Sequence, residues 1–215
     1  SYEISYYQYL YPYNNYQILL DNFKYFKEFG GNYIYPEGTW ENMNNPGFAK
    51  LRDYINSKGM FDVNSDYNQL VDKFFKYYFR EAAPIMRAYF NEIQVNLSDK
   101  EKITGGGVHS YGLSSNKVWT EGMITNWCNS FKAAELAIEK YKKTDGDLYE
   151  ALKTHILIES LFPRYVLCTT YARSYSAEQR KEMRKAFIED FEKLGNTTHQ
   201  EHYTISAVTS TWDLT

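Results

Sequence analysis

Two short runs near the start of the chain have the hydrophobic pattern of β-strands, and the apolar positions after them recur at helical spacing. The runs are SYEISYYQYLYPY (residues 1–13) and GGNYIYPEGTW (residues 30–40), and residues 15–29 between them predict an amphipathic helix. Parallel strands joined by a helix are normally buried in a larger sheet. We therefore expect these runs to be the last strands of a barrel or doubly wound domain, in a piece of a longer protein.

Beyond residue 45 the pattern predicts helices separated by turns. Pro46-Gly47 opens a helix that runs to Lys58, and Ser65 or Asp66 starts the next one. Pro84 is expected in the first turn of a further helix, where its missing N–H costs little. Two capping-box patterns, Asp147 with Glu150 and Ser176 with Gln179, start later helices, the second of which ends near Gly195.

The longest predicted helix runs from Trp119 to Lys143, because apolar residues recur along it at intervals of three and four. This stripe consists of Trp119, Met123, Trp127, Phe131, Ala134, Ile138 and Tyr141. Such a stripe is typical of core packing rather than of a cofactor site. The run from Ser98 to Leu113 contains Gly105-Gly106-Gly107 and predicts a long loop.

These elements predict a mainly α fold, a multi-helix bundle following the last β/α units of a truncated (β/α)8 barrel. We expect residues 1–45 to be the barrel remnant and residues 46–215 to be an α-helical domain. Within that domain the Gly-rich loop separates the helical groups 46–97 and 117–203. The segment after Thr204 has a strand-like or irregular pattern.

Composition narrows the classes of partner. The net charge is −3 with basic and acidic residues mixed along the helices, so we do not expect nucleic-acid binding. The longest apolar run, Ile156 to Leu161, is interrupted by Glu159, and no segment is expected to span a membrane. Cys128 and Cys168 lie among apolar neighbours and are expected to be buried free thiols.

No motif indicates a metal or a cofactor, and we expect neither. His199 and His202 are three residues apart, whereas the zinc-protease motif needs a spacing of four with Glu between. His109 follows three glycines, but the Gly-Lys-Ser or Gly-Lys-Thr ending of a phosphate-binding loop is absent. The sequence also assembles no catalytic triad from neighbouring residues.

Tyrosine is the clearest bias in the composition, with 22 copies beside 13 Phe and 4 Trp. A cluster of six tyrosines lies where the first predicted strand runs into a loop; its members are Tyr6, Tyr7, Tyr9, Tyr11, Tyr13 and Tyr16. Tyrosine offers an apolar face together with a hydroxyl. In sheets with helical crossovers, ligands gather at the carboxyl ends of the strands, which makes this cluster a possible binding surface.

The first 97 residues resemble a known family. The stretches LRDYINSKGMFD (51–62) and FFKYYFREAAPIMRAYF (74–90), after the two aromatic runs, are similar to the C-terminal half of a bacterial domain of unknown function. That family occurs in large glycoside-hydrolase-like proteins, related to barrel enzymes typified by α-glucuronidases and β-hexosaminidases. The resemblance implies a helical region after a (β/α)8 barrel, carbohydrate chemistry, and an extracellular or cell-surface location.

This resemblance implies that the chain contributes aromatic and acidic residues to a saccharide cleft. The predicted contacts are Tyr7, Tyr11, Tyr35, Glu37 and Trp40. Glycoside hydrolysis needs two carboxyl groups, and in the related enzymes these come from strands that would precede Ser1. The catalytic residues are therefore unknown, and the chain alone is expected to be inactive. Glu37 could equally face solvent or pair with Lys24.

Two interpretations of function remain open. In the first, the chain is the C-terminal portion of a carbohydrate-active protein and binds an oligo- or polysaccharide. In the second, it is a non-catalytic helical module for oligomerisation or for packing on a missing N-terminal domain, with its tyrosines at an interface where aromatic residues are enriched. Convergence of the predicted contacts on an open concave surface would favour the first interpretation.

Overall fold

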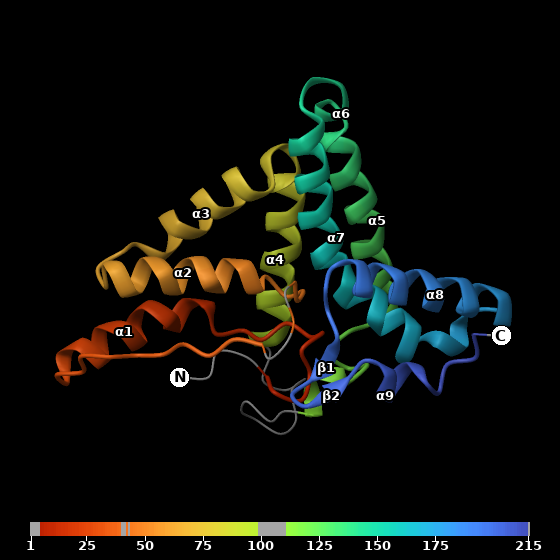
Figure 1. Cartoon of the computed structure of the whole chain (residues 1–215), viewed down its shortest axis with the longest axis horizontal. Helices are drawn as coiled ribbons and strands as arrows, with labels where there is room; N and C mark the ends of the chain where they lie inside the picture. Colours follow the sequence, from red (N-terminus) through yellow and green to blue (C-terminus); the bar gives the residue numbers. More distant parts are fainter. Residues whose placement is uncertain (1–4, 40–41, 43, 99–110, 215) are drawn as a thin grey trace.

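The computed structural model describes residues 5–39, 42, 44–98 and 111–214 (Figure 1). Its helices are α1 (Leu19–Glu28), α2 (Ala49–Phe61), α3 (Tyr67–Tyr78), α4 (Ala83–Ser98), α5 (Glu121–Ile138), α6 (Tyr141–Thr144), α7 (Gly146–Thr169), α8 (Ala177–Lys193) and α9 (Ser206–Thr209). Short 3-10 turns are η1 (Tyr16–Ile18), η2 (Arg80–Ala82), η3 (Tyr111–Ser114) and η4 (Ala172–Ser174). Strands β1 (Thr198–Gln200) and β2 (Tyr203–Thr204) pair antiparallel. The predicted mainly α class is confirmed.

Helices α4, α5 and α7 form the centre of the molecule (Figure 1). α5 and α7 pack along each other and are connected at one end through α6, while α4 packs against α5. α1, α2 and α3 are stacked in sequence order on one side, and α8 packs against α7 on the other. Short connections join α2 to α3 and α5 to α7, as expected for neighbours in a bundle, whereas longer segments precede α2 and α5.

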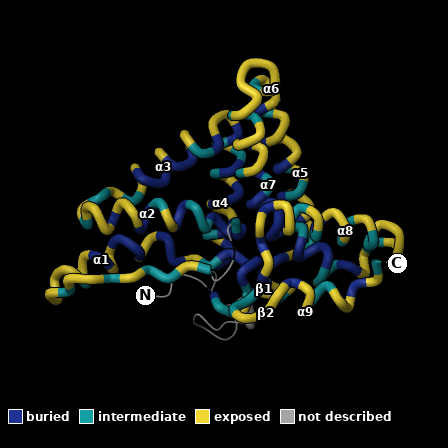
Figure 2. Tube along the Cα trace, viewed as in Figure 1, coloured by how far each residue is buried: buried dark blue, intermediate teal, exposed yellow. Residues whose placement is uncertain are grey.

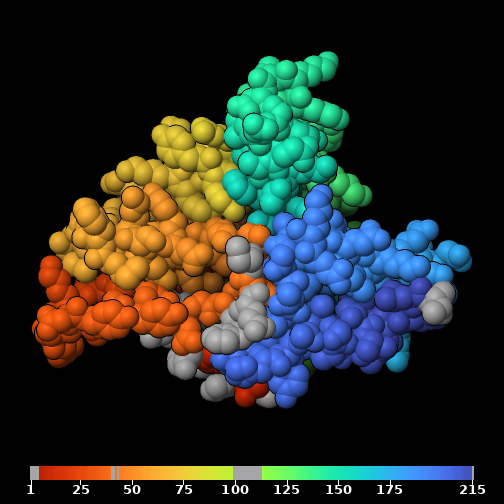
Figure 3. All heavy atoms as spheres, in the orientation of Figure 1, coloured from red at the N-terminus to blue at the C-terminus, as the bar shows by residue number. Residues whose placement is uncertain are grey.

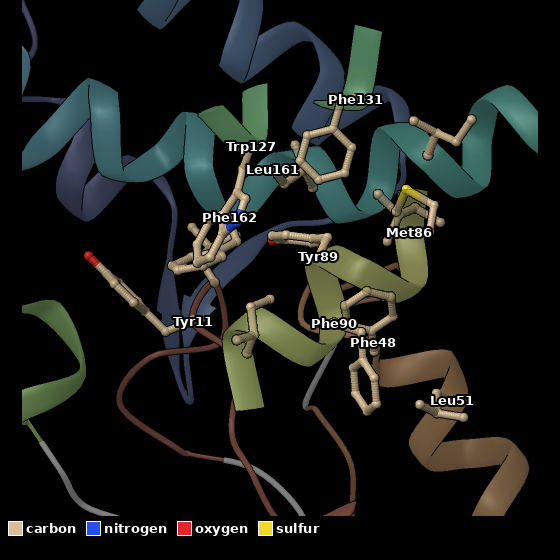
Figure 4. Close-up of a cluster of buried hydrophobic side chains, with 14 of the residues drawn as sticks. Tyr11, Phe48, Leu51, Met86, Tyr89, Phe90, Trp127, Phe131, Leu161 and Phe162 are labelled. Carbon is tan, nitrogen blue, oxygen red and sulfur yellow. The ribbon is translucent and has the colours of Figure 1, made fainter. Parts of the chain in front are cut away.

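Aromatic side chains fill the core where these groups of helices meet (Figure 4). The ring of Phe48, just before α2, lies 4.9 Å from that of Phe90 and 5.6 Å from that of Tyr89 on α4. Tyr89 contacts Trp127 of α5 edge-on at 5.0 Å. The Phe48–Phe90 and Tyr89–Trp127 pairs are edge-to-face, a geometry that is favourable beyond the area that it buries. Much of the aromatic composition therefore serves packing, as the helical stripe predicted.

The two predicted strands near the N-terminus are wrong for the described residues. Residues 5–11 form turns, in which the amide N of Tyr11 donates to the carbonyl O of Gln8 at 3.1 Å. Tyr9, Leu10 and Tyr11 are all buried in succession, whereas a strand with one solvent-facing side alternates. Residues 31–39 are extended without a strand, apart from an isolated bridge at Glu37. The alternating tyrosines match the sequence pattern of a strand, but packing against the rest of the molecule determines the observed conformation.

Most helix boundaries agree with their sequence signals. Asp66 caps α3 by accepting from the Gln69 amide at 2.7 Å, and Gly30 ends the α1 turn with a φ of 79°. Ser176 and Gln179 form the predicted capping box at the start of α8. Each of these signals is local, so the sequence alone is enough to place them.

Three predicted helix starts move by a few residues. α2 begins at Ala49, because Gly47 and Phe48 take left-handed φ values of 72° and 55°. α5 begins at Glu121, where Thr120 caps the Met123 amide, so Trp119 precedes the helix. In α7 the cap is Asp145 rather than Asp147, and its carboxylate accepts from the Leu148 amide at 3.0 Å. Pro84 lies in the first turn of α4, as predicted.

The segment after Thr204, predicted to be strand-like or irregular, contains the short helix α9, and the strands β1 and β2 precede it. Cys128 and Cys168 are free thiols, as predicted, but only Cys168 is buried, and Cys128 is half-buried. Most of the predicted Gly-rich loop, residues 99–110, lies outside the described residues. The domain boundary at residue 45 stays a prediction. Described residues on both sides of it share one core, in which the Tyr11 ring lies 5.4 Å from that of Phe162.

Candidate functional site

A hollow with a volume of about 470 Å3 combines aromatic and polar side chains. Three segments far apart in sequence form most of it: residues 7–11, the end of α7 with Thr170, and β1. Ser114 of η3 and Val208 of α9 complete the lining. Its aromatic lining is Tyr7, Tyr11 and Tyr165, and its polar lining includes Gln8, Thr169, Thr170, His199 and Gln200. We call this hollow the tyrosine cavity. Ligand sites in proteins commonly have volumes of this size.

Backbone hydrogen bonds hold the N-terminal wall of the tyrosine cavity against the β1–β2 hairpin. The Tyr9 amide donates to the carbonyl O of His199, and the Glu201 amide donates to that of Tyr6, both at 2.9 Å. The two segments therefore lie side by side although about 190 residues separate them. This pairing fixes Gln8 and Tyr7 opposite the hairpin.

The tyrosines of the cavity are held by rings beneath them. The Tyr11 ring meets the Tyr165 ring at 5.9 Å with an interplanar angle of 85°, and it also contacts Phe162 of the core. Figure 4 shows the Tyr11 hydroxyl pointing away from the other labelled side chains. Tyr11 is 7% exposed and Tyr7 is 37% exposed. The two residues thus form the floor and an accessible wall.

Uncharged groups make up the lining of the tyrosine cavity at neutral pH. No Asp, Glu, Lys or Arg is among the described residues that line it. Burial raises the pKa of the Tyr11 hydroxyl above its ordinary value and raises that of Tyr165 to about 12, so both stay protonated. Burial lowers the pKa of His199, which favours the neutral imidazole. The cavity can therefore exchange hydrogen bonds without attracting or repelling charge.

His199 has a defined tautomer in this arrangement. Its Nδ1 lies 2.9 Å from the carbonyl O of Thr204, and a carbonyl oxygen only accepts. Nδ1 therefore carries the proton when the ring is neutral. Nε2 is then a hydrogen-bond acceptor, which suits a hydroxyl donor.

A group of asparagines positions the hairpin, and the sequence analysis did not identify them. Asn42 Oδ1 accepts from the amides of Thr197 and Thr198 at 2.8 and 2.9 Å. Asn196 Nδ2 donates to the carbonyl O of Asn44 at 2.7 Å, and Asn196 Oδ1 accepts from the Asn44 amide at 3.0 Å. The Asn-rich run at residues 42–45 is visible in the sequence. The sequence does not show that its hydrogen-bond partners lie about 150 residues away.

Glu159 is a second functional group that was not predicted as a site residue. It is 2% exposed in the middle of α7, and its Oε2 accepts from the amide of Phe48 at 2.9 Å. Burial raises its pKa to about 8, while the Phe48 and Gly47 amides and Arg52 act in the opposite direction. Glu159 does not line the tyrosine cavity. In the sequence, Glu159 is notable because it interrupts an apolar run.

The other predicted contacts lie apart from the tyrosine cavity. Tyr35 is 63% exposed and Glu37 is half-buried, and neither lines a described hollow. A smaller hollow of about 190 Å3 borders Pro36 and Gly38, on either side of Glu37. Trp40 lies outside the described residues. The structure therefore brings together Tyr7 and Tyr11 from the predicted set.

The described residues contain no cluster of three or more His, Cys, Asp or Glu that could hold a metal ion. No helix among them is long and apolar enough to cross a membrane, in line with the sequence prediction. His199 and His202 belong to the hairpin rather than to a helix, and His202 has a left-handed φ of 63°.

Comparison with known protein families gives a match that covers less than half of the chain. No curated protein matches the chain, and no solved structure matches it. The match ends within α4, so it includes the N-terminal wall of the tyrosine cavity but not α7 or the hairpin. Residues 1–91 match the model of a family described as a domain of unknown function, DUF4838.

Proposed function

We propose that the chain binds a neutral oligo- or polysaccharide in the tyrosine cavity. The observation that carries this proposal is the uncharged lining, in which Tyr7 and Tyr11 border the same hollow as amide and hydroxyl side chains. Aromatic faces suit the apolar faces of pyranose rings, and amides and hydroxyls suit sugar hydroxyl groups. The His199 Nε2 acceptor adds a site for a sugar O–H.

Binding without hydrolysis is the activity that this lining supports. A glycosidase needs two carboxyl groups on either side of the scissile bond, and the described lining has none. Glu37 lies outside the cavity lining. We therefore expect no turnover of aryl-glycosides or uronides by this chain alone. A glycoside-hydrolase-like relationship is implied only by the resemblance of residues 1–97, and the binding proposal does not depend on it.

Affinity electrophoresis tests the proposal. The native chain should be retarded in gels that contain one of the neutral polysaccharides xylan, mannan or glucan. Tyr7→Ala removes an accessible ring and should weaken binding roughly fivefold, the usual range for an aromatic contact. Tyr77→Ala is the matched control, because Tyr77 is 58% exposed on α3, away from the cavity. Equal retardation of both variants, or none for the native chain, would contradict the proposal.

Trp40→Ala belongs in the same gels, because Trp40 stays a predicted contact. Loss of retardation in this variant would extend the binding surface from the cavity toward residues 36–42. Unchanged retardation would remove Trp40 from the set of contacts and leave the tyrosine cavity as the site.

A second candidate function is association of two copies of the chain through the ends of α1 and α2. Phe29 is 84% exposed and Phe61 is 92% exposed, and the nearby Met60 is 49% exposed. These ends form one extremity of the molecule (left in Figures 1 and 3) and are coloured as exposed in Figure 2. Exposed apolar groups of this size often mark an interaction site. Flanking charges of both signs, at 27–28, 58 and 62, would let two copies pair.

A further inference from the structure

A separate hollow of about 420 Å3 lies between α5, α7 and α8. Four basic side chains border it: Lys132 from α5, Lys153 and Arg164 from α7, and Lys193 from α8. We call it the basic groove. It shares no described lining residue with the tyrosine cavity.

Positive charge is in excess in the basic groove. Two acidic residues also line it, Glu135 and Asp190. Arg164 Nη1 lies 2.7 Å from Asp190 Oδ2, and in this ion pair the two charges neutralise each other. The three lysines form no ion pair within the described part of the chain. The lining therefore carries two more positive than negative charges, in a chain whose net charge is −3.

Beneath the charges the groove is apolar. Phe131 and Leu157 line it beside Cys128, and Phe131 is 6% exposed. Burial raises the pKa of the Cys128 thiol to about 11, so the sulfur is a neutral, weakly polar group at physiological pH. Ser160 Oγ already donates to the carbonyl O of Leu157 at 2.8 Å. The floor thus offers contact area rather than a nucleophile.

Each of the three lysines, taken alone, could be an ordinary solvated surface residue, and Lys193 in the last turn of α8 also complements the helix dipole. Solvation alone does not explain why the three lysines border the same hollow. Three helices each place a lysine around one apolar floor, where like charges repel in the absence of a counterion. A bound anion removes this repulsion and gains charge-assisted hydrogen bonds.

We propose that the basic groove binds a small organic anion, a phosphate or carboxylate joined to an apolar group. The anionic group lies between the three lysines, and the apolar group packs on Phe131 and Leu157. Charge and shape are both required, because the lysines alone would bind any small ion and the floor alone would bind neutral molecules.

Calorimetric titration of the full chain with three probes tests this proposal. The probes are phenyl phosphate, phenylacetate and benzyl alcohol. We expect saturable binding of at least one anion, weakened by added salt, and no binding of benzyl alcohol at the same concentrations. Preference between the two anions identifies the headgroup. Failure of both anions to bind at roughly 10 mM, or equal binding of benzyl alcohol, would overturn the proposal.

Exposed lysines provide variants that should fold normally. Lys132→Gln and Lys153→Gln should each weaken binding of the preferred anion by about fivefold, the range for a charge-assisted contact at a partly exposed site. Lys185→Gln is the control, since Lys185 is exposed on α8 outside the groove. Equal effects of all three substitutions would indicate a general charge effect and contradict the site.

Cys128 supplies an independent readout of location. It is half-buried in the groove, whereas Cys168 is buried elsewhere. A saturating anion should slow the modification of Cys128 by N-ethylmaleimide severalfold, as followed by peptide mass. An unchanged rate at saturation would place the anion outside the groove and overturn the proposal.

Discussion

Glu159 shows how one buried carboxyl group connects distant parts of the chain. Its carboxyl group on α7 accepts a hydrogen bond from the amide of Phe48. Phe48 has a left-handed backbone conformation and immediately precedes α2. Gly47 beside it also needs a left-handed φ, and a Cβ there would lie 2.8 Å from Pro12 Cα. The N-terminal turns, the start of α2 and α7 therefore meet at one carboxyl group.

Arg52 extends this group of buried polar residues. Its Nε donates to Asn15 Oδ1 and its Nη2 donates to the carbonyl O of Tyr13, both at 3.0 Å. The guanidinium also lies 5.0 Å from the centre of the Tyr16 ring. Breaking such a network leaves buried polar groups without partners, which is costly.

The raised pKa of Glu159 predicts a pH-dependent stability. The folded chain holds this proton up to about pH 8, and the unfolded chain releases it near its ordinary value of 4.5. The proton therefore stabilises the fold fully below pH 4.5, and this stabilisation is lost as the pH rises toward 8. Between pH 5 and 8 the loss should be on the order of 3 kcal/mol.

Urea unfolding of the native chain and of Glu159→Gln measures this effect. Glutamine keeps an acceptor for the Phe48 amide and does not ionise, so the variant should gain stability relative to the native chain as the pH rises. Glu150→Gln, on the exposed side of α7, should keep the native pH dependence. The difference between chains removes the contribution of His155 and His199, whose lowered pKa values act in the opposite sense. A constant difference from pH 5 to 8 would contradict the assignment.

At the scale of elements, α1 and α2 bury one face and expose their ends. Gly59 of α2 packs closely on α1, where an added Cβ would lie 2.6 Å from the Phe23 ring. Beyond this contact Phe29 and Phe61 extend into solvent. The buried apolar side chains of the other helices belong largely to one shared core.

We predict that the native chain self-associates through these ends. Sedimentation velocity at increasing protein concentration should detect a dimer, and Phe61→Glu should shift the equilibrium to the monomer by placing a charge at the contact. Leu136→Glu is the control, because Leu136 is 65% exposed on α5. A native chain that stays monomeric at every concentration, or an equal effect of both substitutions, would count against the second candidate function.

Across the whole molecule, the features that could be predicted from the sequence are those that depend on neighbouring residues. Asp66 and Ser176 cap their helices as expected, since a cap depends on residues three positions apart. The tyrosine run misled the strand prediction because Tyr9 and Tyr11 pack against helices rather than into a sheet. Burial by partners far along the chain is not visible in a run of thirteen residues.

In the tyrosine cavity, too, residues that are close in sequence were predicted and distant ones were not. Tyr7 and Tyr11 were identified because they lie together in sequence. Thr169, Thr170 and His199 complete the tyrosine cavity from positions about 160 to 190 residues away, and nothing in their local sequence indicates this meeting. Asn42 is a similar case, since its partners are in the hairpin.

Hydrogen exchange read by mass spectrometry tests saccharide binding in the tyrosine cavity most directly, because it locates the segments that the sugar protects. The native chain would be compared with and without saturating xylohexaose, mannohexaose or cellohexaose, whichever matches the polysaccharide that retards it. We predict slower exchange in peptides covering residues 5–11, 165–170 and 198–201, with α3 unchanged. Protection confined to other segments, or no protection by any of the three sugars, would contradict the account.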